Sequence, residues 1–291
     1  MFLYLVILLK AIFILLLVLM GASDLFAQEV VSLSTSATYG LYSESQQRDN
    51  IVSESVVLSY TIVPIAGLNL ALNHSSLSRK SRLSTINVNT ANLSYYEFMT
   101  TSSGNYIGGK GALHYIQSDD PNSNGAMIPY LSVSYKPESL LYAFEIGVAR
   151  TPYIDTTAQQ VSIMGAVALL FFDIDVWAQT RVTYINLLTT TRLRDPTLAV
   201  EERLYYTLIP DELTLSLYAL FGERIYAYDA DLSTSYNLPD TQKGSLGISL
   251  NYNLDDDISL FTDFTQEKYD NVAITNQYRV IYYTAGLSAR F

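Results

Sequence analysis

The sequence of 291 residues contains no cysteine, only one tryptophan and only two histidines. Disulfides therefore cannot stabilise the protein, and no Cys or His cluster is available to bind a metal ion. There is no phosphate-binding loop, so we expect neither a metal nor a cofactor. Beyond the first two dozen residues no run of 18 apolar residues occurs, which excludes a helical membrane span from the body of the chain.

Positive charge is also scarce, since 17 Lys and Arg residues stand against 28 Asp and Glu, for a net charge of −11. Binding to nucleic acid requires a basic face, so nucleic acid is not an expected partner. Many of the acidic residues fall in connecting segments, such as Asp119 with Asp120 and Asp229 with Asp231. We interpret these acidic loops as solvating segments.

Tyrosine, by contrast, is abundant, with 24 residues, and Ser, Thr, Asn and Gly are frequent. A tyrosine side chain combines an apolar ring with a hydrated hydroxyl, which suits a membrane interface. Although 49% of the residues are hydrophobic, they alternate with polar residues and do not gather in long runs. The composition is typical of an exported protein with an interfacial surface.

The N-terminus predicts a secretory signal peptide over residues 1–27. Ala11 to Met20 is an apolar core of ten residues preceded by Lys10, and the following segment ends in a small residue, Ala27, which offers a cleavage site. The alternative, an uncleaved membrane anchor, would place Lys10 within the span. We therefore expect the mature domain to cover residues 28–291.

From Glu29 onward, apolar and polar residues alternate with the period of two that places them on opposite faces of a β-strand. In the first segment, Leu33, Tyr39 and Leu41 share one face and Ser34 and Ser36 share the other. The pattern predicts a first strand from Glu29 and further strands at 51–63, 67–78, 84–98, 106–117, 127–135, 140–150, 160–171, 174–184, 198–208, 213–228, 244–254, 258–269 and 278–291.

Fourteen strands is thus the predicted number. Alternation is poor between Ser84 and Ile107, where Leu93, Tyr95 and Tyr96 are out of phase, so a β-bulge or a merged pair, and a total of twelve strands, is the alternative. Short connections, such as Phe172–Asp173, alternate with longer polar ones, such as Gln117 to Gly125 and Asp229 to Lys243. This is typical of the periplasmic turns and extracellular loops of a bacterial outer-membrane barrel.

Several strands that would run toward the periplasm end near an aromatic residue. We expect these residues to form one interfacial belt, which a soluble all-β sandwich would not need. They are Tyr60, Tyr135, Phe171, Tyr206, Tyr252 and Phe291.

The last segment alternates up to a terminal aromatic, with Tyr283, Leu287 and Phe291 on one face. It resembles the assembly signal of Gram-negative outer-membrane β-barrel proteins, and with the leader and strand pattern the resemblance covers nearly the whole chain. The resemblance implies an all-β, transmembrane, antiparallel up-and-down barrel in the bacterial outer membrane. It also implies contact with outer-membrane lipid and lipopolysaccharide, and insertion by the barrel assembly machinery.

The polar face of the strands is expected to line the lumen, where water tolerates charges of both signs. The candidate lumen-lining residues are Asn87, Asn89, Lys110, His114, Glu145, Asp175, Arg181, Arg203, Asn251, Asp263 and Glu267. No segment resembles a plug, and the chain looks more like the small monomeric porins than like fatty-acid transporters with an N-terminal hatch. We therefore predict an unobstructed channel for passive diffusion of small hydrophilic solutes, with a mild cation preference.

A second hypothesis is a lipid hydrolase. His74 and Ser76 share a strand face, so His74 could act as a base toward Ser76, and Glu54 on the preceding strand is expected roughly opposite Ser76. The His-x-Ser pattern resembles that of outer-membrane phospholipase A and lipid A deacylase, although Leu77 and Ser78 follow here where the phospholipase has Asn and Gly. The competing interpretation is that polar residues mark where the strand enters the headgroups.

A third hypothesis is a non-transporting scaffold barrel.

Overall fold

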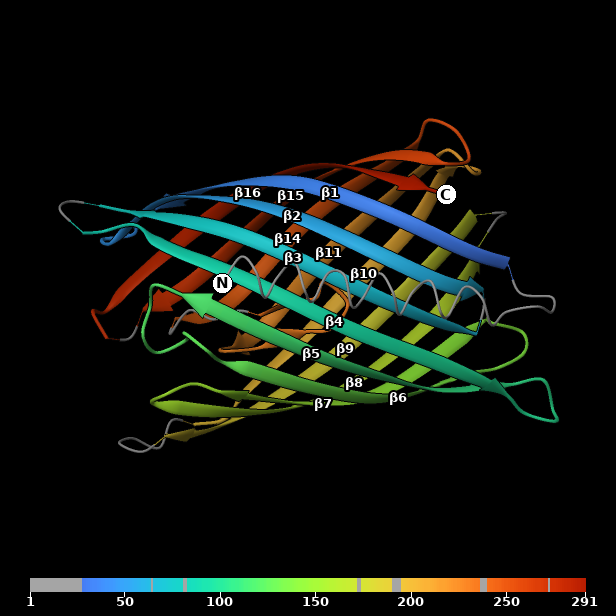
Figure 1. Cartoon of the computed structure of the whole chain (residues 1–291), viewed down its shortest axis with the longest axis horizontal. Helices are drawn as coiled ribbons and strands as arrows, with labels where there is room; N and C mark the ends of the chain where they lie inside the picture. Colours follow the sequence, from blue (N-terminus) through green and yellow to red (C-terminus); the bar gives the residue numbers. More distant parts are fainter. Residues whose placement is uncertain are drawn as a thin grey trace, which may run out of the picture.

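The structure is a computed structural model that describes residues 28–63, 65–80, 83–171, 174–189, 195–235, 240–271 and 273–291. In it, apolar and polar residues alternate between the two faces of each strand, as the sequence pattern predicts. The predicted signal peptide, residues 1–27, lies outside the described residues. The fold is an all-β antiparallel barrel, as predicted (Figure 1). No helix in the described part of the chain is long and apolar enough to cross a membrane.

Fourteen strands form the barrel wall. They are β1 (Gln28–Ser43), β2 (Arg48–Val63), β3 (Ala66–Arg79), β4 (Ile86–Thr100), β5 (Tyr106–Ser118), β6 (Met127–Lys136), β7 (Tyr142–Pro152), β8 (Thr156–Phe171), β9 (Ile174–Thr189), β10 (Thr197–Ile209), β11 (Leu213–Arg224), β14 (Thr241–Asn253), β15 (Ile258–Asn271) and β16 (Asn276–Arg290). Two short strands, β12 (Tyr228–Asp229) and β13 (Thr234–Ser235), pair with each other between β11 and β14.

Each wall strand pairs with its neighbours in the chain, and β16 pairs with β1 to close the barrel. The prediction of fourteen strands is confirmed, and the twelve-strand alternative is wrong. Strand β4 pairs in continuous register with β3 and β5, so the bulge considered there is absent; Leu93 and Tyr95 point outward while Tyr96 points inward. The prediction that one strand runs from Leu213 to Tyr228 is also wrong, because β11 ends at Arg224.

The two ends of the barrel differ in their connections. At one end, called the turn end, β2 meets β3, β4 meets β5, β6 meets β7, β8 meets β9, β10 meets β11 and β14 meets β15, and the connections described in full are 101–105, 137–141, 210–212 and 254–257. At the other, called the loop end, β1 meets β2, β3 meets β4, β5 meets β6, β7 meets β8, β9 meets β10 and β15 meets β16, and the connections described in full are 44–47, 119–126 and 153–155. Residue 28 and the C-terminal Phe291 both lie at the turn end, as an even number of strands requires.

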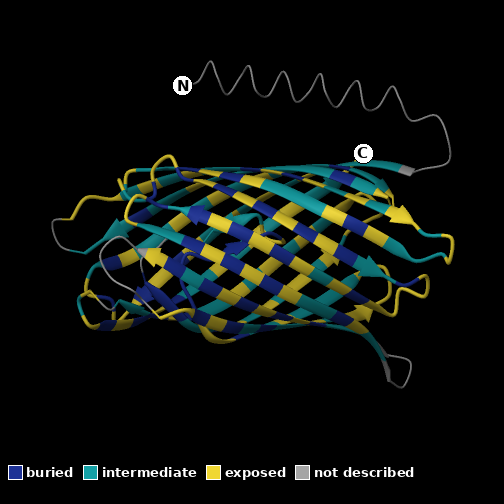
Figure 2. Cartoon of the chain, turned by 90° about the horizontal axis from the view of Figure 1, so that it is seen from below, coloured by how far each residue is buried: buried dark blue, intermediate teal, exposed yellow. Residues whose placement is uncertain are grey.

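The outer and inner faces differ in polarity along each strand. In β6, the outward residues Leu131 and Val133 are each 64% exposed, whereas the inward residues Ser132 and Ser134 are buried. The same alternation covers the barrel surface as bands of exposed and buried residues (Figure 2). An apolar belt outside and a polar interior are what a barrel surrounded by lipid requires.

The predicted aromatic belt falls near the turn end. Tyr135, Tyr206 and Tyr252 occupy outward positions of their strands, and Phe291 is exposed. The side chain of Phe171 lies outside the described side chains. Tyr60 also has outward parity in β2, although its side chain is buried.

Closure between β1 and β16 combines backbone and side-chain bonds. The Val31 and Phe291 backbones exchange two hydrogen bonds, at 2.8 and 3.3 Å. On the inner face, Ser34 and Ser288 pair at 2.8 Å, and so do Thr38 and Thr284. Tyr283 and Leu287, predicted to belong to the assembly signal, point outward and are exposed.

The outward face yields a stability prediction. Ile146 lies in the middle of β7 and is 57% exposed. Ile146→Arg should therefore destabilise the barrel in lipid vesicles by about 2–4 kcal/mol, the cost of a cation on the lipid face at the bilayer centre. Denaturant titration monitored by the fluorescence of the single tryptophan, Trp177, measures this.

Ile154→Arg provides the matched control, because Ile154 is 69% exposed but lies in the loop-end connection 153–155. We expect it to change the free energy of unfolding little. Equal effects of the two substitutions would show that the centre of β7 does not face lipid.

Candidate functional site: a segment folded into the barrel

After β11 the chain enters the barrel interior. Residues 225–230 are all buried, with exposed fractions of 1 to 6%. Their direction is set where β11 ends: the register with β14 shifts between Phe221 and Arg224, and Gly222 has a φ of +88°. A β-carbon at Gly222 would also overlap the backbone oxygen of Leu198, so this turn requires glycine. We call residues 225–235 the inward segment.

Its first attachment is ionic. The Asp229 carboxylate lies 3.2 Å from Arg203 and 3.7 Å from Arg181, and Asp231 forms a 2.5 Å ion pair with Arg181. Lys110 Nζ is 3.7 Å from Asp231. Lys110, Arg181 and Arg203 project from β5, β9 and β10, so the ion pairs connect the inward segment to three wall strands.

A second group of bonds surrounds Tyr228. Its hydroxyl donates to Asn92 Oδ1 at 2.7 Å, and its backbone exchanges two hydrogen bonds with the Gln160 amide, at 2.9 and 3.0 Å. The tyrosine ring lies 5.6 Å from the rings of His114 and Tyr130. These bonds satisfy buried polar groups that would otherwise cost free energy.

Two further bonds extend the attachment along β5. Lys110 Nζ donates to the backbone oxygen of Ala230 at 2.7 Å, and the Ser235 hydroxyl lies 3.2 Å from His114 Nε2. At the base of the segment, Glu201 pairs with Arg203 at 2.7 Å and with Arg224 at 3.3 Å. The inward segment is thus held against the wall formed by β4, β5 and β8 to β10.

The expectation of an unobstructed lumen is therefore wrong. Asp229 and Asp231, interpreted from the sequence as part of a solvating loop, instead form ion pairs with wall residues inside the barrel. The alternation in 213–228 resembles a continued strand, and this concealed the point at which the chain leaves the wall. Gly222 followed by two charged residues, Glu223 and Arg224, was the one signal available.

The candidate lumen-lining residues take several positions. Lys110, His114, Arg181 and Arg203 contact the inward segment. Glu145 accepts hydrogen bonds from Tyr130 at 2.7 Å and Ser134 at 3.1 Å, and Glu267 accepts one from Tyr269 at 2.6 Å. The side chain of Asp175 lies outside the described side chains.

Asn87 and Asn89 are exposed on the outer face, so their assignment to the lumen is wrong. The out-of-phase residues in the sequence of β4 hid its parity. Asn92, Gln160 and Glu201, which hold or flank the inward segment, were not predicted because their partners lie far away in the chain.

The inward segment leaves space along the opposite wall. A cavity of about 610 Å³ is lined by residues of β1 to β4, β10, β11 and β14 to β16, and by the inward segment itself. A second cavity, of about 460 Å³, lies nearer the loop end. The two share Thr38, Asn73, Thr90, Thr234, Glu267 and Tyr282, so they adjoin each other.

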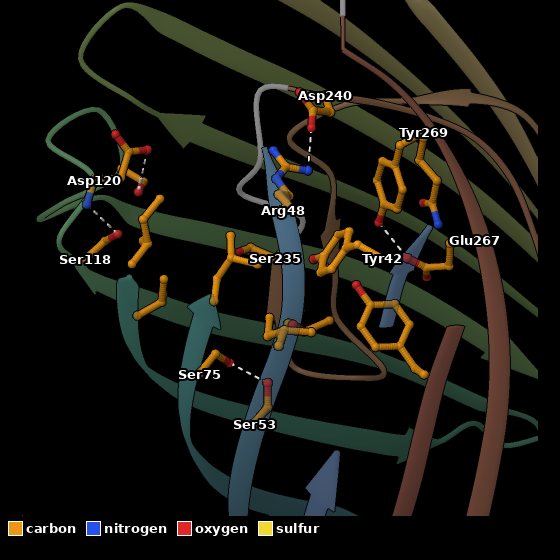
Figure 3. Close-up of a pocket in the computed structure, with 18 of the residues that line it drawn as sticks. Tyr42, Arg48, Ser53, Ser75, Ser118, Asp120, Ser235, Asp240, Glu267 and Tyr269 are labelled. Carbon is orange, nitrogen blue, oxygen red and sulfur yellow. Dashed lines mark hydrogen bonds and ion pairs between the residues drawn. The ribbon is translucent and has the colours of Figure 1, made fainter. Parts of the chain in front are cut away.

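Near the loop end, an ion pair reaches across this space (Figure 3). Arg48 pairs with Asp240 at 2.5 Å, and both also bond the Tyr278 hydroxyl. The rings of Tyr269 and Tyr278 stack with centroids 5.3 Å apart. Further along the wall of the same cavity, Ser53 and Ser75 pair at 2.8 Å.

The candidate hydrolase residues lie on the outer face. Glu54 pairs in register with His74, not with Ser76 as predicted, and Ser76 lies opposite Val52. His74 Nδ1 is 2.9 Å from Oδ1 of Asn89 on β4. No group of His, Asp or Glu suited to holding a metal ion occurs among the described residues.

Comparison with known proteins places the fold in a class. No protein-family model and no curated protein matches the sequence. Among solved structures, a TodX monoaromatic hydrocarbon channel (deltaS2S3 mutant) has a TM-score of 0.56 and 12% identity, covering 94% of this chain and 92% of that one. Omp33 of Acinetobacter baumannii has a TM-score of 0.54 and 7% identity, covering 90% and 99%.

A third similar structure, described as a bacterial polysaccharide outer membrane secretin, has a TM-score of 0.53 and 10% identity, covering 90% of this chain and 98% of that one. These likenesses show that the chain has the fold of bacterial outer-membrane β-barrel proteins. At such low identity they show the fold alone.

The ionic attachment predicts that Asp229→Asn detaches the inward segment. The substitution removes a carboxylate shared by two largely buried guanidinium groups, and breaking a buried ion pair costs about 3–5 kcal/mol. We expect faster proteolysis within 225–240 in the refolded protein, mapped by mass spectrometry. Asp256→Asn, in the exposed turn 254–257, should leave the cleavage pattern unchanged; equal resistance of all three proteins would contradict an ionic attachment.

The same carboxylate predicts a pH dependence. Burial alone would raise the pKa of Asp229, but Arg203, Arg181 and Arg224 lower it to about 2. An unfolded Asp has a pKa of about 3.9, so the attachment is fully stabilised above about pH 4 and loses this contribution as the pH falls toward 2. Pepsin should cleave the segment increasingly between pH 4 and 2, whereas Asp229→Asn should already be sensitive at pH 4.

Proposed function

We propose that the protein is an outer-membrane channel for the passive diffusion of small hydrophilic solutes, in which the inward segment narrows the bore. The observation that carries this proposal is the asymmetry of the interior. The inward segment is held against β4, β5 and β8 to β10, while adjoining cavities of about 610 and 460 Å³ remain, lined mainly by β1 to β4, β11 and β14 to β16.

The lining of this space suits polar solutes. Hydroxyl groups pair from strand to strand along the inner wall, with Ser36 to Ser55 at 2.7 Å and Ser53 to Ser75 at 2.8 Å. Such side chains can exchange their mutual hydrogen bonds for bonds to water or to a passing solute. An apolar solute would gain little from this wall, in contrast to the apolar interior of a dry binding pocket.

The turn end would face the periplasm and the loop end the exterior. The apolar outer face and the aromatic side chains near the turn end support this placement, as does the shared fold of outer-membrane proteins. The inward segment would then restrict entry from outside. Its ion pairs make it part of the wall, which supports a permanent constriction and not a mobile plug.

Charge inside the bore supports a mild cation preference. Arg181 and Arg203 are neutralised by ion pairs. Asp263 lines the larger cavity and makes no ion pair within the described part of the chain. A carboxylate without a counter-charge attracts cations into a narrow polar pathway.

Asp263→Asn should therefore lower the permeability of K⁺ relative to Cl⁻. Reversal potentials across a planar bilayer, measured with a salt gradient, report this ratio. Asp256→Asn serves as the control because Asp256 lies in the exposed turn 254–257. A ratio unaltered by Asp263→Asn would remove Asp263 from the conduction pathway.

Replacing residues 226–235 by a short Gly/Ser linker tests the channel itself. We expect the parent protein to produce stable single-channel currents and the variant to produce larger ones, because the constriction is gone. Absence of current in both proteins would overturn the channel and favour a scaffold barrel. Current in the variant alone would show that the inward segment closes the bore completely.

A further inference from the structure

Polar side chains cluster on the outer face where the apolar surface ends. On β2, β3 and β4, the outward residues Val56, Leu72 and Ala91 lie at one level, in register with each other. At the next outward position of each strand toward the loop end, two residues further along, lie Glu54, His74 and Asn89, again in register. We call Glu54, His74, Ser76 and Asn89 the outer-face cluster.

The level of this cluster corresponds to the edge of a bilayer. His74 lies eight residues beyond the start of β3 at Ala66, which is about 26 Å along the strand at about 3.3 Å per residue. With a strand tilt of about 40°, it stands about 20 Å above the turn end, close to the upper limit of an apolar band about 25 Å tall. The ester carbonyls of membrane lipids lie at this boundary.

The geometry within the cluster orients His74. Its Nδ1 is 2.9 Å from the side-chain oxygen of Asn89, an acceptor, and this contact is a hydrogen bond in the tautomer of the neutral imidazole that is protonated on Nδ1. Nε2 then carries the lone pair and is the basic nitrogen. An oxygen acceptor that holds a histidine in this tautomer is the feature that makes the ring a general base for a serine hydroxyl.

Ser76 supplies that hydroxyl. It lies two residues beyond His74 on the same strand, and residues two apart share a face. Glu54 is the residue of β2 in register with His74, so the other neighbouring strand carries an acidic residue at the same level. The arrangement differs from the one expected from the sequence, because Asn89, and not Glu54, holds the histidine.

We propose that Ser76, His74 and Asn89 form a hydrolytic site for the carboxylic esters of membrane lipids. The acyl chain would lie along the apolar surface of Leu70, Leu72 and Val56, which places its ester carbonyl beside Ser76. Ser76 and His74 are the catalytic residues, and Asn89 is a positioning residue. The site is independent of the channel, because it lies on the opposite face of the wall from Asn73 and Ser75, which line the cavities.

The chemistry proceeds in two balanced steps. Ser76 Oγ attacks the ester carbonyl while its proton passes to His74 Nε2; the C–O bond of the ester then breaks, and the alcohol leaves with that proton. Water next attacks the acyl-serine with His74 again as base, which releases a fatty acid and restores the Ser76 hydroxyl.

Fatty-acid release from phosphatidylcholine vesicles containing the refolded protein tests the site. We expect Ser76→Ala and His74→Ala to abolish release. Asn89→Ala should lower it on the order of 10- to 100-fold and shift its pH profile, while Asn89→Asp, which keeps an oxygen acceptor, should restore it. Ser75→Ala, on the inner face, and Ser78→Ala, two residues beyond Ser76, are matched controls expected to retain it.

A fluorophosphonate probe provides a second measurement, since it labels only an activated serine. Labelling of Ser76 in the parent protein and its loss in His74→Ala would support the proposal. Absence of both labelling and fatty-acid release in the parent protein, or release unchanged by Ser76→Ala, would overturn it. Denaturant titration of the same Ser76→Ala protein, followed by Trp177 fluorescence, shows that the barrel is folded, and planar-bilayer currents test the channel separately.

Discussion

Closure of the sheet by hydrogen bonds between β1 and β16 is the constraint on which the other features depend. A strand surrounded by hydrocarbon cannot leave backbone donors and acceptors unpaired, so all fourteen strands must find two partners. Closure in turn requires an unbroken alternation of faces, because a slip of one residue would turn the polar side chains of a strand toward lipid. The hydroxyl pairs that join Ser34 to Ser288 and Thr38 to Thr284 continue this pairing on the inner face.

A barrel of this size has an interior that side chains alone do not fill, and the chain partly fills it with its own connection. Burial of Asp229 would be unfavourable without a counter-charge, and Arg181 and Arg203 supply it from two adjacent wall strands. The cations thus stabilise the inward segment, while hydroxyl-rich strands and Asp263 line the larger of the remaining cavities.

The wall also separates two chemical environments only one residue apart. In β3, Asn73 and Ser75 line the cavities, while His74 lies on the outer face beside Glu54 and Asn89. Alternation therefore gives one strand an inner face toward the cavities and an outer face beside Glu54 and Asn89, with no side chain in common.

The sequence by itself determined the fold class, the fourteen strands, and the outward parity of residues such as Leu131 and Tyr283, because these depend on a period of two along the chain. It also placed His74 and Ser76 on one face. Only the tertiary structure decided that Asp229 enters the barrel and that Asn89 holds His74. Both depend on partners brought together by strand pairing and barrel closure, and local periodicity carries no information about them. For the same reason, the interior predicted as unobstructed contains the inward segment.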